Sequence, residues 1–219
     1  MELELYDLKN NNMPNRTDVL NHLARKHSLE KYLEIGVQDV RQNFENIVCT
    51  LKLGVDPNYS YVSHEGNDVV LMMTSDEFFE NPPHSLAFDW ISEFDLIFID
   101  GLHTAEQVRK DFENALKILS PKGFIVMHDC NPEKEEHTIV PRPTPTGHWN
   151  GDVYRFASCL GYGHDCFFTV DIDNGCGVWR NCNEQYVPNE FLTEIKWEWF
   201  AKNRERCLNL TPWNEFIAL

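Results

Sequence analysis

The chain has 219 residues, of which 42% are hydrophobic and 12% aromatic, so it can bury one substantial core but is short for two domains. Its formal charge of −16 and its few basic clusters argue against a nucleic-acid partner, which needs a positively charged footprint. No apolar run approaches the roughly 18 residues of a membrane span, and the amino terminus lacks a signal-peptide pattern. We predict one cytoplasmic domain over residues 1–219 that binds neither nucleic acid nor a membrane.

Strand and helix patterns alternate along the chain. Short apolar runs rich in β-branched and aromatic residues predict seven strands. These strands span residues 32–36, 49–55, 68–73, 94–99, 124–127, 166–172 and 177–179. Helical spacing or capping signals predict the helices, at residues 17–27, 42–47, 75–79, 104–119, 152–160 and 191–208. The alternation predicts a doubly wound α/β fold, with helices on both faces of a mostly parallel sheet and the last two strands in an antiparallel hairpin.

Three parts of the chain lie outside this regular pattern. Residues 1–30 read as an N-terminal helical appendage, and residues 190–210 as a C-terminal helix that packs on the sheet or on a second subunit of a homo-oligomer. The third part, residues 130–150, contains four prolines and no periodic pattern. A connection of this length in a compact domain is usually functional or disordered, and its position beside Asp129 favours an active-site lid.

Seven cysteines are present, an odd number, and no two of them form a C-x-x-C pair. This spacing is typical neither of a zinc knuckle nor of a disulfide framework. We therefore expect reduced and mostly buried thiols at Cys49, Cys130, Cys159, Cys166, Cys176, Cys182 and Cys207.

The most informative stretch is residues 94–131, in which two apolar runs each end in an acidic residue and a helical pattern separates them. Both strands of such a unit point the same way in one sheet. Asp100 and Asp129 should therefore emerge at the same carboxyl edge, where open α/β sheets bind their ligands.

The end of the first predicted strand indicates which cofactor fits. Gly36 stands where a G-x-G-x-x-G loop would begin, but Gln38 and Arg41 replace its other glycines. A side chain at the second position obstructs the close approach of a diphosphate, so a dinucleotide is disfavoured. Asp56, at the end of the second strand, can accept hydrogen bonds from ribose hydroxyls.

A cofactor with a ribose and no pyrophosphate fits this pattern, and S-adenosylmethionine (SAM) meets that description. We expect Glu34, Gly36 and Val37 near its methionine portion. We expect Ser75 and Asp76 near its adenine.

Several blocks of the chain resemble a bacterial group of class I SAM-dependent methyltransferases that includes macrocin-type O-methyltransferases. The blocks are YLEIGVQDVRQNF, GVDP, MMTSDEFF, FDLIFIDGLHTAEQVRKDFENALKIL, GFIVMHDCNP, WNGDVYRF and WEWFAKNRERCLNL. The resemblance implies a Rossmann-like, seven-stranded sheet with a reversed last strand, SAM as cofactor, and a divalent metal held by carboxylates beside a histidine base. It places the metal carboxylates at Asp100 and Asp129 and the base at His103. The missing second glycine departs from the pattern of many class I enzymes.

The chemistry of methyl transfer needs residues of this kind. The acceptor hydroxyl must be made nucleophilic and aimed at the methyl carbon. Mg²⁺ held by Asp100 and Asp129 would lower the pKa of the hydroxyl, and His103 would take its proton. Asn131 or Asp76 is a candidate third ligand. We predict O-methylation of a small hydroxylated acceptor, such as a sugar or glycoside.

Other interpretations stay open. Asp100 before Gly101 is a common turn, Asp129 and His103 can act as caps, and His128 favours a packed position on its strand. Trp149 is a candidate to stack on a sugar ring, or else belongs to an ordinary start of a helix. A metal-independent methyltransferase with His103 as the base, and a non-catalytic module that binds SAM or a protein partner, are the alternatives.

Overall fold

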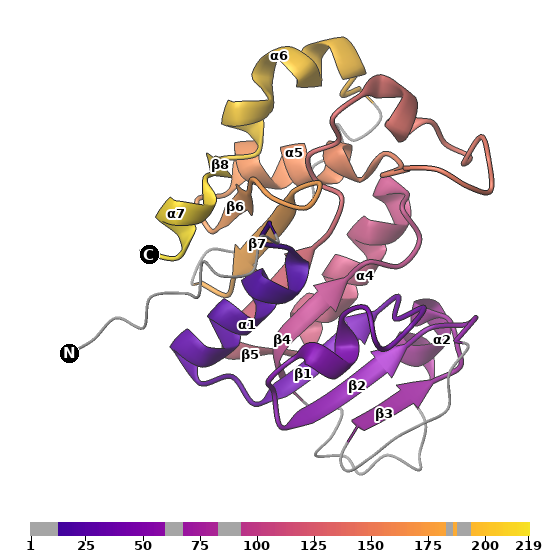
Figure 1. Ribbon diagram of the computed structural model, residues 1–219, viewed down its shortest axis with the longest axis vertical. Coiled ribbons are helices and arrows are strands. Elements are labelled where there is room, and N and C mark those ends of the chain that lie inside the picture. The colour runs from indigo at the N-terminus through magenta and orange to yellow at the C-terminus, as the bar shows by residue number, and fades with distance from the viewer. Residues whose placement is uncertain (1–12, 60–67, 83–92, 183–185, 188–193) are drawn as a thin grey trace.

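The computed structural model describes residues 13–59, 68–82, 93–182, 186–187 and 194–219. Its strands form one eight-stranded sheet in the order β3-β2-β1-β4-β5-β7-β6-β8 (Figure 1). The bounds are β1 Lys31–Ile35, β2 Leu51–Val55, β3 Asp68–Leu71, β4 Phe94–Ile99, β5 Leu119–Met127, β6 Phe167–Val170, β7 Cys176–Arg180 and β8 Leu210–Thr211. The first five strands are parallel, and β7 runs antiparallel to both β5 and β6. The predicted fold class is confirmed, and the two-residue β8 adds an eighth strand.

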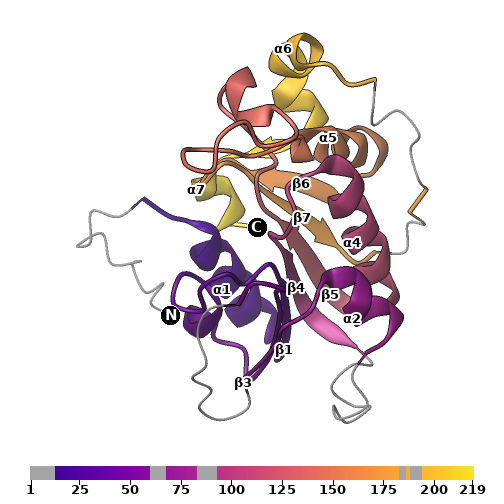
Figure 2. The same cartoon turned by 90° about the vertical axis from the view of Figure 1, so that its right-hand side faces the viewer.

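The described helices are α1 Arg16–His27, α2 Ser75–Glu80, α4 Ala105–Lys117, α5 Val153–Gly163, α6 Trp197–Cys207 and α7 Trp213–Phe216, with 3-10 turns η1 Phe44–Asn46 and η2 Glu135–Thr138. Helices cover both faces of the sheet, with α1 on one side and α4 on the other (Figure 2). None of them, within the described ranges, has the length and apolar character that a bilayer span requires.

Strand β4 shows why its sequence is apolar from Leu96 to Ile99. Leu96 and Phe98 belong to the apolar cluster that contains α1, whereas Ile97 and Ile99 belong to the cluster that contains α4 and α5. Side chains alternate between the two faces of a strand, and here both faces are covered by helices. A continuous apolar run is therefore what this position in the sheet requires.

The helix between β4 and β5 forms as its spacing predicts. Thr104 is the N-cap, and its hydroxyl accepts a hydrogen bond from the backbone N–H of Gln107. Val108, Phe112 and Ala115 lie on one buried face of α4. The helix thereby returns the chain to the sheet for the parallel strand β5.

Strand β5 begins five residues earlier than predicted, at Leu119 rather than Phe124. Pro121 and Gly123 lie inside it, although such residues commonly end regular structure. Pro121 and Lys122 are exposed, and the pairing with β4 shifts register between Phe94 and Leu96. An irregularity of this kind tolerates a residue that cannot donate a hydrogen bond to the ladder.

The C-terminal helix packs mainly on another helix. Helix α6 begins at Trp197, and the start predicted at residue 191 lies outside the described residues. Phe200 is fully buried, and its ring centroid lies 4.5 Å from that of Tyr154 on α5. The apolar side of α6 therefore rests on α5, and the helix also contacts β8 at the edge of the sheet. Its packing on a second subunit stays a prediction.

One prediction about the cysteines is wrong. Cys166 and Cys182 form a disulfide with a Cα–Cα distance of 6.5 Å, whereas five other cysteines are free and buried. The antiparallel pairing of β6 and β7 brings these two together, because the backbone N–H of Arg180 donates to the carbonyl of Cys166. The 16-residue separation gives no local signal of this pairing.

Candidate functional site

The carboxyl ends of β4 and β5 bring Asp100 and Asp129 to the same edge of the sheet. The parallel register places Ile99 beside Met127, so the residues that follow these two lie side by side. Asp100 comes directly after β4, and Asp129 lies two residues after β5. The convergence inferred from the strand-helix-strand pattern is therefore what the geometry shows.

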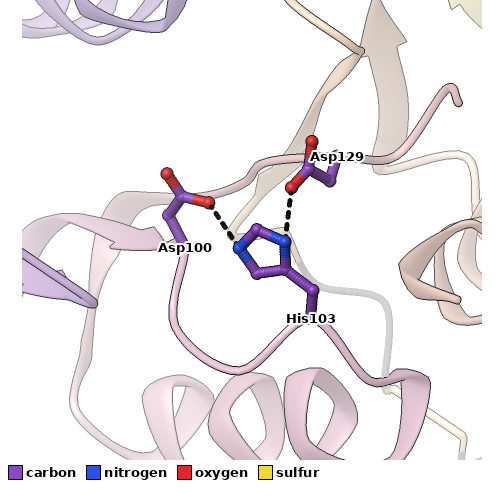
Figure 3. A group of neighbouring side chains, drawn as sticks. All are labelled: Asp100, His103 and Asp129. Atoms are coloured by element: carbon purple, nitrogen blue, oxygen red, sulfur yellow. Dashed lines mark ion pairs between the residues drawn. The ribbon is translucent and has the colours of Figure 1, made fainter. Parts of the chain in front are cut away.

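His103, in the loop between β4 and α4, lies between the two carboxylates (Figure 3). Its Nε2 is 3.4 Å from Oδ1 of Asp100, and its Nδ1 is 2.9 Å from Oδ2 of Asp129. One possible ligand atom from each of these three residues lies within 4.8 Å of the others. Two carboxylates and an imidazole at this spacing are a donor set for a divalent cation, and they also form a self-contained ion-paired group.

The charges of this group shift one another's pKa values. Burial disfavours the charged imidazole, but hydrogen bonds to Asp100 and Asp129 outweigh burial and raise the pKa of His103 to about 10. Burial likewise works against ionised Asp100 and Asp129, but the charge of His128 and hydrogen bonds from both histidines lower the pKa of each carboxyl. The ring as it stands is therefore a proton-bearing donor to two ionised acids at neutral pH.

Two basic side chains that the sequence analysis did not assign to the site also contact the acids. Arg16, at the start of α1, places Nη1 2.6 Å from Oδ2 of Asp100 and Nε 3.2 Å from Oδ2 of Asp173 in the β6–β7 turn. His128 is buried, with Nδ1 3.4 Å from Asp100 and 3.3 Å from Asp129. The buried position of His128 agrees with its interpretation as a packed histidine. No local motif marks Arg16 or Asp173, since their partners are distant in the chain.

The turn after β1 lies directly against Asp100. Gly36 has a φ of +89°, and a Cβ there would come 2.2 Å from the carbonyl oxygen of Asp100. Only glycine combines this backbone conformation with so close an approach. Val37, expected near the cofactor, is buried in the apolar cluster that contains α1, so its side chain serves the core.

Asp56 holds the loop after β1 in place. Its Oδ2 accepts a hydrogen bond of 2.8 Å from the backbone N–H of Gln38, and its Oδ1 accepts one of 2.7 Å from that of Asn58. The carboxylate lies at the end of β2, as expected. Each of its oxygens accepts one backbone N–H and has a second lone pair to offer, and the role of Asp56 toward ribose hydroxyls stays a prediction.

Glu34 is buried within the fold rather than exposed at the site. Its carboxyl is 2% exposed and accepts hydrogen bonds from the hydroxyl of Tyr32, at 2.6 Å, and from the amide of Asn43, at 3.0 Å. Burial raises the pKa of Glu34 to about 8, although these two hydrogen bonds oppose the shift. The contact with the methionine portion of SAM stays a prediction, and the side chain as it stands is bonded to Tyr32 and Asn43.

Replacing Glu34 with glutamine should make stability less dependent on pH. Because the folded-state pKa lies near 8 and the usual value is 4.5, the contribution of Glu34 to stability is greatest below pH 4.5 and falls as the pH rises toward 8. The loss is at most about 1.4 kcal/mol per pH unit in that window. As the pH rises, the free energy of unfolding of E34Q should therefore increase relative to that of the wild type by up to this amount per pH unit. Urea unfolding across the window measures it. E198Q, at an exposed position, should keep the wild-type dependence, and parallel curves for wild type and E34Q would refute the assignment.

The remaining predicted residues lie elsewhere in the structure. Asp76 is 2.7 Å from Nζ of Lys110 and accepts a hydrogen bond from Gln107, so this end of α2 is tied to α4. Ser75 accepts a hydrogen bond from the same Gln107 amide. Asn131 donates to Asp171 and accepts from Arg204. The structure thus does not bring the side chain of Asn131 to Asp100, His103 and Asp129.

Comparison with known proteins agrees with this fold. A family model described as a methyltransferase domain matches residues 11–130, more than half of the chain. The protein therefore belongs to this family of methyltransferase domains. No curated protein matches the chain significantly.

Solved structures share the fold at low identity. A structure from Klebsiella pneumoniae, described as that of a proposed O-methyltransferase, is 16% identical with a TM-score of 0.53, over 78% of this chain and 82% of that one. The SAH-bound methyltransferase PaMTH1 of Podospora anserina is 18% identical with a TM-score of 0.52, over 78% and 80% of the two chains. At these identities the likeness establishes the Rossmann-like methyltransferase fold.

Proposed function

We propose that this protein transfers a methyl group from SAM to a hydroxyl of a small acceptor, such as a sugar or glycoside, with the help of a divalent metal ion. One observation carries the proposal. Asp100, His103 and Asp129 offer ligand atoms within 4.8 Å of one another, at the strand ends beside the Gly36 turn. The family supplies the methyl-transfer chemistry, and this cluster supplies groups that can act on the acceptor.

The donor set suits a hard cation. Mg²⁺ prefers about six oxygen ligands, so Asp100 and Asp129 would supply part of its shell and water and the acceptor hydroxyl the remainder. When bound there, such an ion would lower the pKa of that hydroxyl. Both carboxylates are ionised at neutral pH, because the neighbouring histidines keep the pKa of each carboxyl low.

In this proposal, one set of residues lies on the cofactor side and His103 acts on the acceptor. Gly36 lets the turn after β1 approach the backbone of Asp100 closely. Asp56, Ser75 and Asp76 follow β2 and β3, on the side of the sheet where SAM is expected. His103 would accept the proton of the acceptor once a cation engages Asp100 and Asp129. Its Nε2 points toward Asp100 (Figure 3), and the acceptor hydroxyl is proposed to approach from that side.

One observation supports a metal-independent methyltransferase, and another argues against it. The cluster balances its own charge, since Arg16 and His128 pair with the same carboxylates that would hold an ion. Against it, the pKa of His103 is raised to about 10, so the ring keeps its proton at neutral pH and is a poor base while both carboxylates hold that proton. We therefore favour metal assistance.

The test has two parts. Binding of SAM, or of its demethylated product, at 100 times the dissociation constant should stabilise the fold by roughly 2.7 kcal/mol, seen as a rise in the unfolding temperature. Methyl transfer to a panel of sugars and glycosides, followed with labelled SAM, should collapse with EDTA and return with Mg²⁺. The absence of a thermal shift would favour the non-catalytic module. A rate of methyl transfer that EDTA does not change would favour the metal-independent enzyme. Cytoplasmic location and self-association stay predictions.

A further inference from the structure

We propose that Trp149 and Asn150 are positioning residues, which hold His103 and Asp129 in the geometry that the site needs. They belong to the segment of residues 149–152, which ends the long loop after β5 and leads into α5. The inference deepens the proposed function and rests on it. It concerns residues that lie against the cluster rather than within it.

Trp149 fixes the plane of the His103 ring. The two rings are stacked, with centroids 5.2 Å apart and planes 11° apart. The guanidinium of Arg142 lies 5.4 Å from the centroid of the Trp149 ring, so that ring is in contact with groups of this chain. The indole N–H donates to the carbonyl of Ile139 at 2.8 Å, which fixes the indole in turn. Trp149 thus stacks on His103, and the sugar contact considered for it stays a prediction.

The carbonyl of Trp149 also faces one ring nitrogen of His103 and holds it as a hydrogen-bond donor. Nδ1 of His103 is 3.3 Å from this carbonyl and 2.9 Å from Oδ2 of Asp129. Two acceptors face Nδ1, so Nδ1 must carry a hydrogen. Nε2 is then the nitrogen left to act toward Asp100 and the acceptor.

Asn150 holds the side chain of Asp129 in place. It is fully buried, and its Nδ2 donates to Oδ1 of Asp129 at 2.5 Å. Its Oδ1 lies 3.1 Å from Nε2 of His148, and its backbone N–H donates to the carbonyl of His137. Asp129 has a φ of +61°, a conformation that a non-glycine residue keeps only when its surroundings hold it.

The last two residues of the segment clamp it to the start of α4. Gly151 has a φ of +63°, and a Cβ there would come within 1.7 Å of the carbonyl oxygen of His103. Asp152 accepts a hydrogen bond from the backbone N–H of Ala105 at 2.7 Å, and its own N–H donates to the carbonyl of His103. The segment is thus bound to both sides of His103. This end of the expected lid belongs to the site itself.

The test compares N150A and W149L with the conservative W149F in the full-length protein. Two control variants make the same substitutions away from the site. N21A removes a buried amide that bonds the backbone at Asn46 and Val48, and W199L removes an exposed tryptophan on α6. Titration with Mn²⁺, followed by the electron paramagnetic resonance of the free ion, measures the affinity of the group Asp100, His103 and Asp129 for the ion. N150A and W149L should bind Mn²⁺ about 10 to 100 times more weakly, and W149F and both controls should bind it as the wild type does.

A second measurement separates this inference from the metal proposal. The Nδ1–H of His103, assigned by its loss in H103Q, should give a slowly exchanging proton signal in ¹⁵N-edited NMR spectra of the wild type and W149F, and W149L should lose it. If the wild type binds no Mn²⁺, the metal proposal fails and the NMR result alone decides the inference. An equally protected signal in W149L, its absence from the wild type, or wild-type Mn²⁺ affinity in both N150A and W149L would overturn it. Should N150A not fold, the W149L and W149F pair decides.

Discussion

Replacing Asp129 with asparagine is expected to lower methyl transfer about 100-fold or more while leaving the fold in place. Asparagine has the same shape and tolerates the left-handed backbone that Asp129 adopts, with φ of +61°. The change removes the charge that would bind a cation. It also leaves a single carbonyl oxygen in place of the two oxygens that face Asn150 and Nδ1 of His103, the latter 2.9 Å away. Initial rates with labelled SAM and the best acceptor of the panel measure the effect.

The control for this variant is D171N. Asp171 lies in the same region of the fold but is exposed, and its side chain accepts a hydrogen bond from Asn131, which lies outside the group of Asp100, His103 and Asp129. Its replacement should leave both the rate and SAM binding unchanged. If D129N kept wild-type turnover while binding SAM normally, the cluster would not be the place of the chemistry, and the proposed mechanism would be wrong.

Replacing Gly36 with alanine is expected to destabilise the protein by about 3 kcal/mol or more and to abolish SAM binding. Two effects add. The φ of +89° is unfavourable for alanine, and its Cβ would come 2.2 Å from the carbonyl oxygen of Asp100, an atom fixed by the sheet because the N–H of Asp100 donates to Ile35. Relief of the overlap would have to separate the ends of β1 and β4.

Gly147 provides a matched control for Gly36. It also has a positive φ, of +105°, but a Cβ there would meet nothing within 4 Å. G147A therefore carries the backbone strain without the overlap and should cost about 1 kcal/mol. Urea unfolding gives both values. Equal losses in the two variants would show that the close approach of Gly36 to Asp100 has no energetic weight.

The residues of the candidate site differ in how far the sequence alone could place them. Asp100 and Asp129 follow apolar runs separated by a helical pattern, and parallel strands end at the same edge, so their convergence follows from chain order. His103 follows Asp100 by three residues and is placed with it. Arg16 reaches Asp100 across 84 residues of the chain, and its backbone N–H reaches Asp173 across 157, so no local pattern predicts these pairs.

The sequence by itself determined the doubly wound sheet, the reversed strand and the meeting of two acids at one rim, because the periodicity of apolar residues is a local property that survives in any compact arrangement. Only the tertiary structure decided that Arg16 neutralises Asp100, that Glu34 turns into the core and that Cys166 bonds to Cys182. It alone also brought Trp149 and Asn150 against His103 and Asp129. Such contacts depend on which faces of the helices, strands and loops pack against one another, and the spacing of apolar residues along the chain does not predict this.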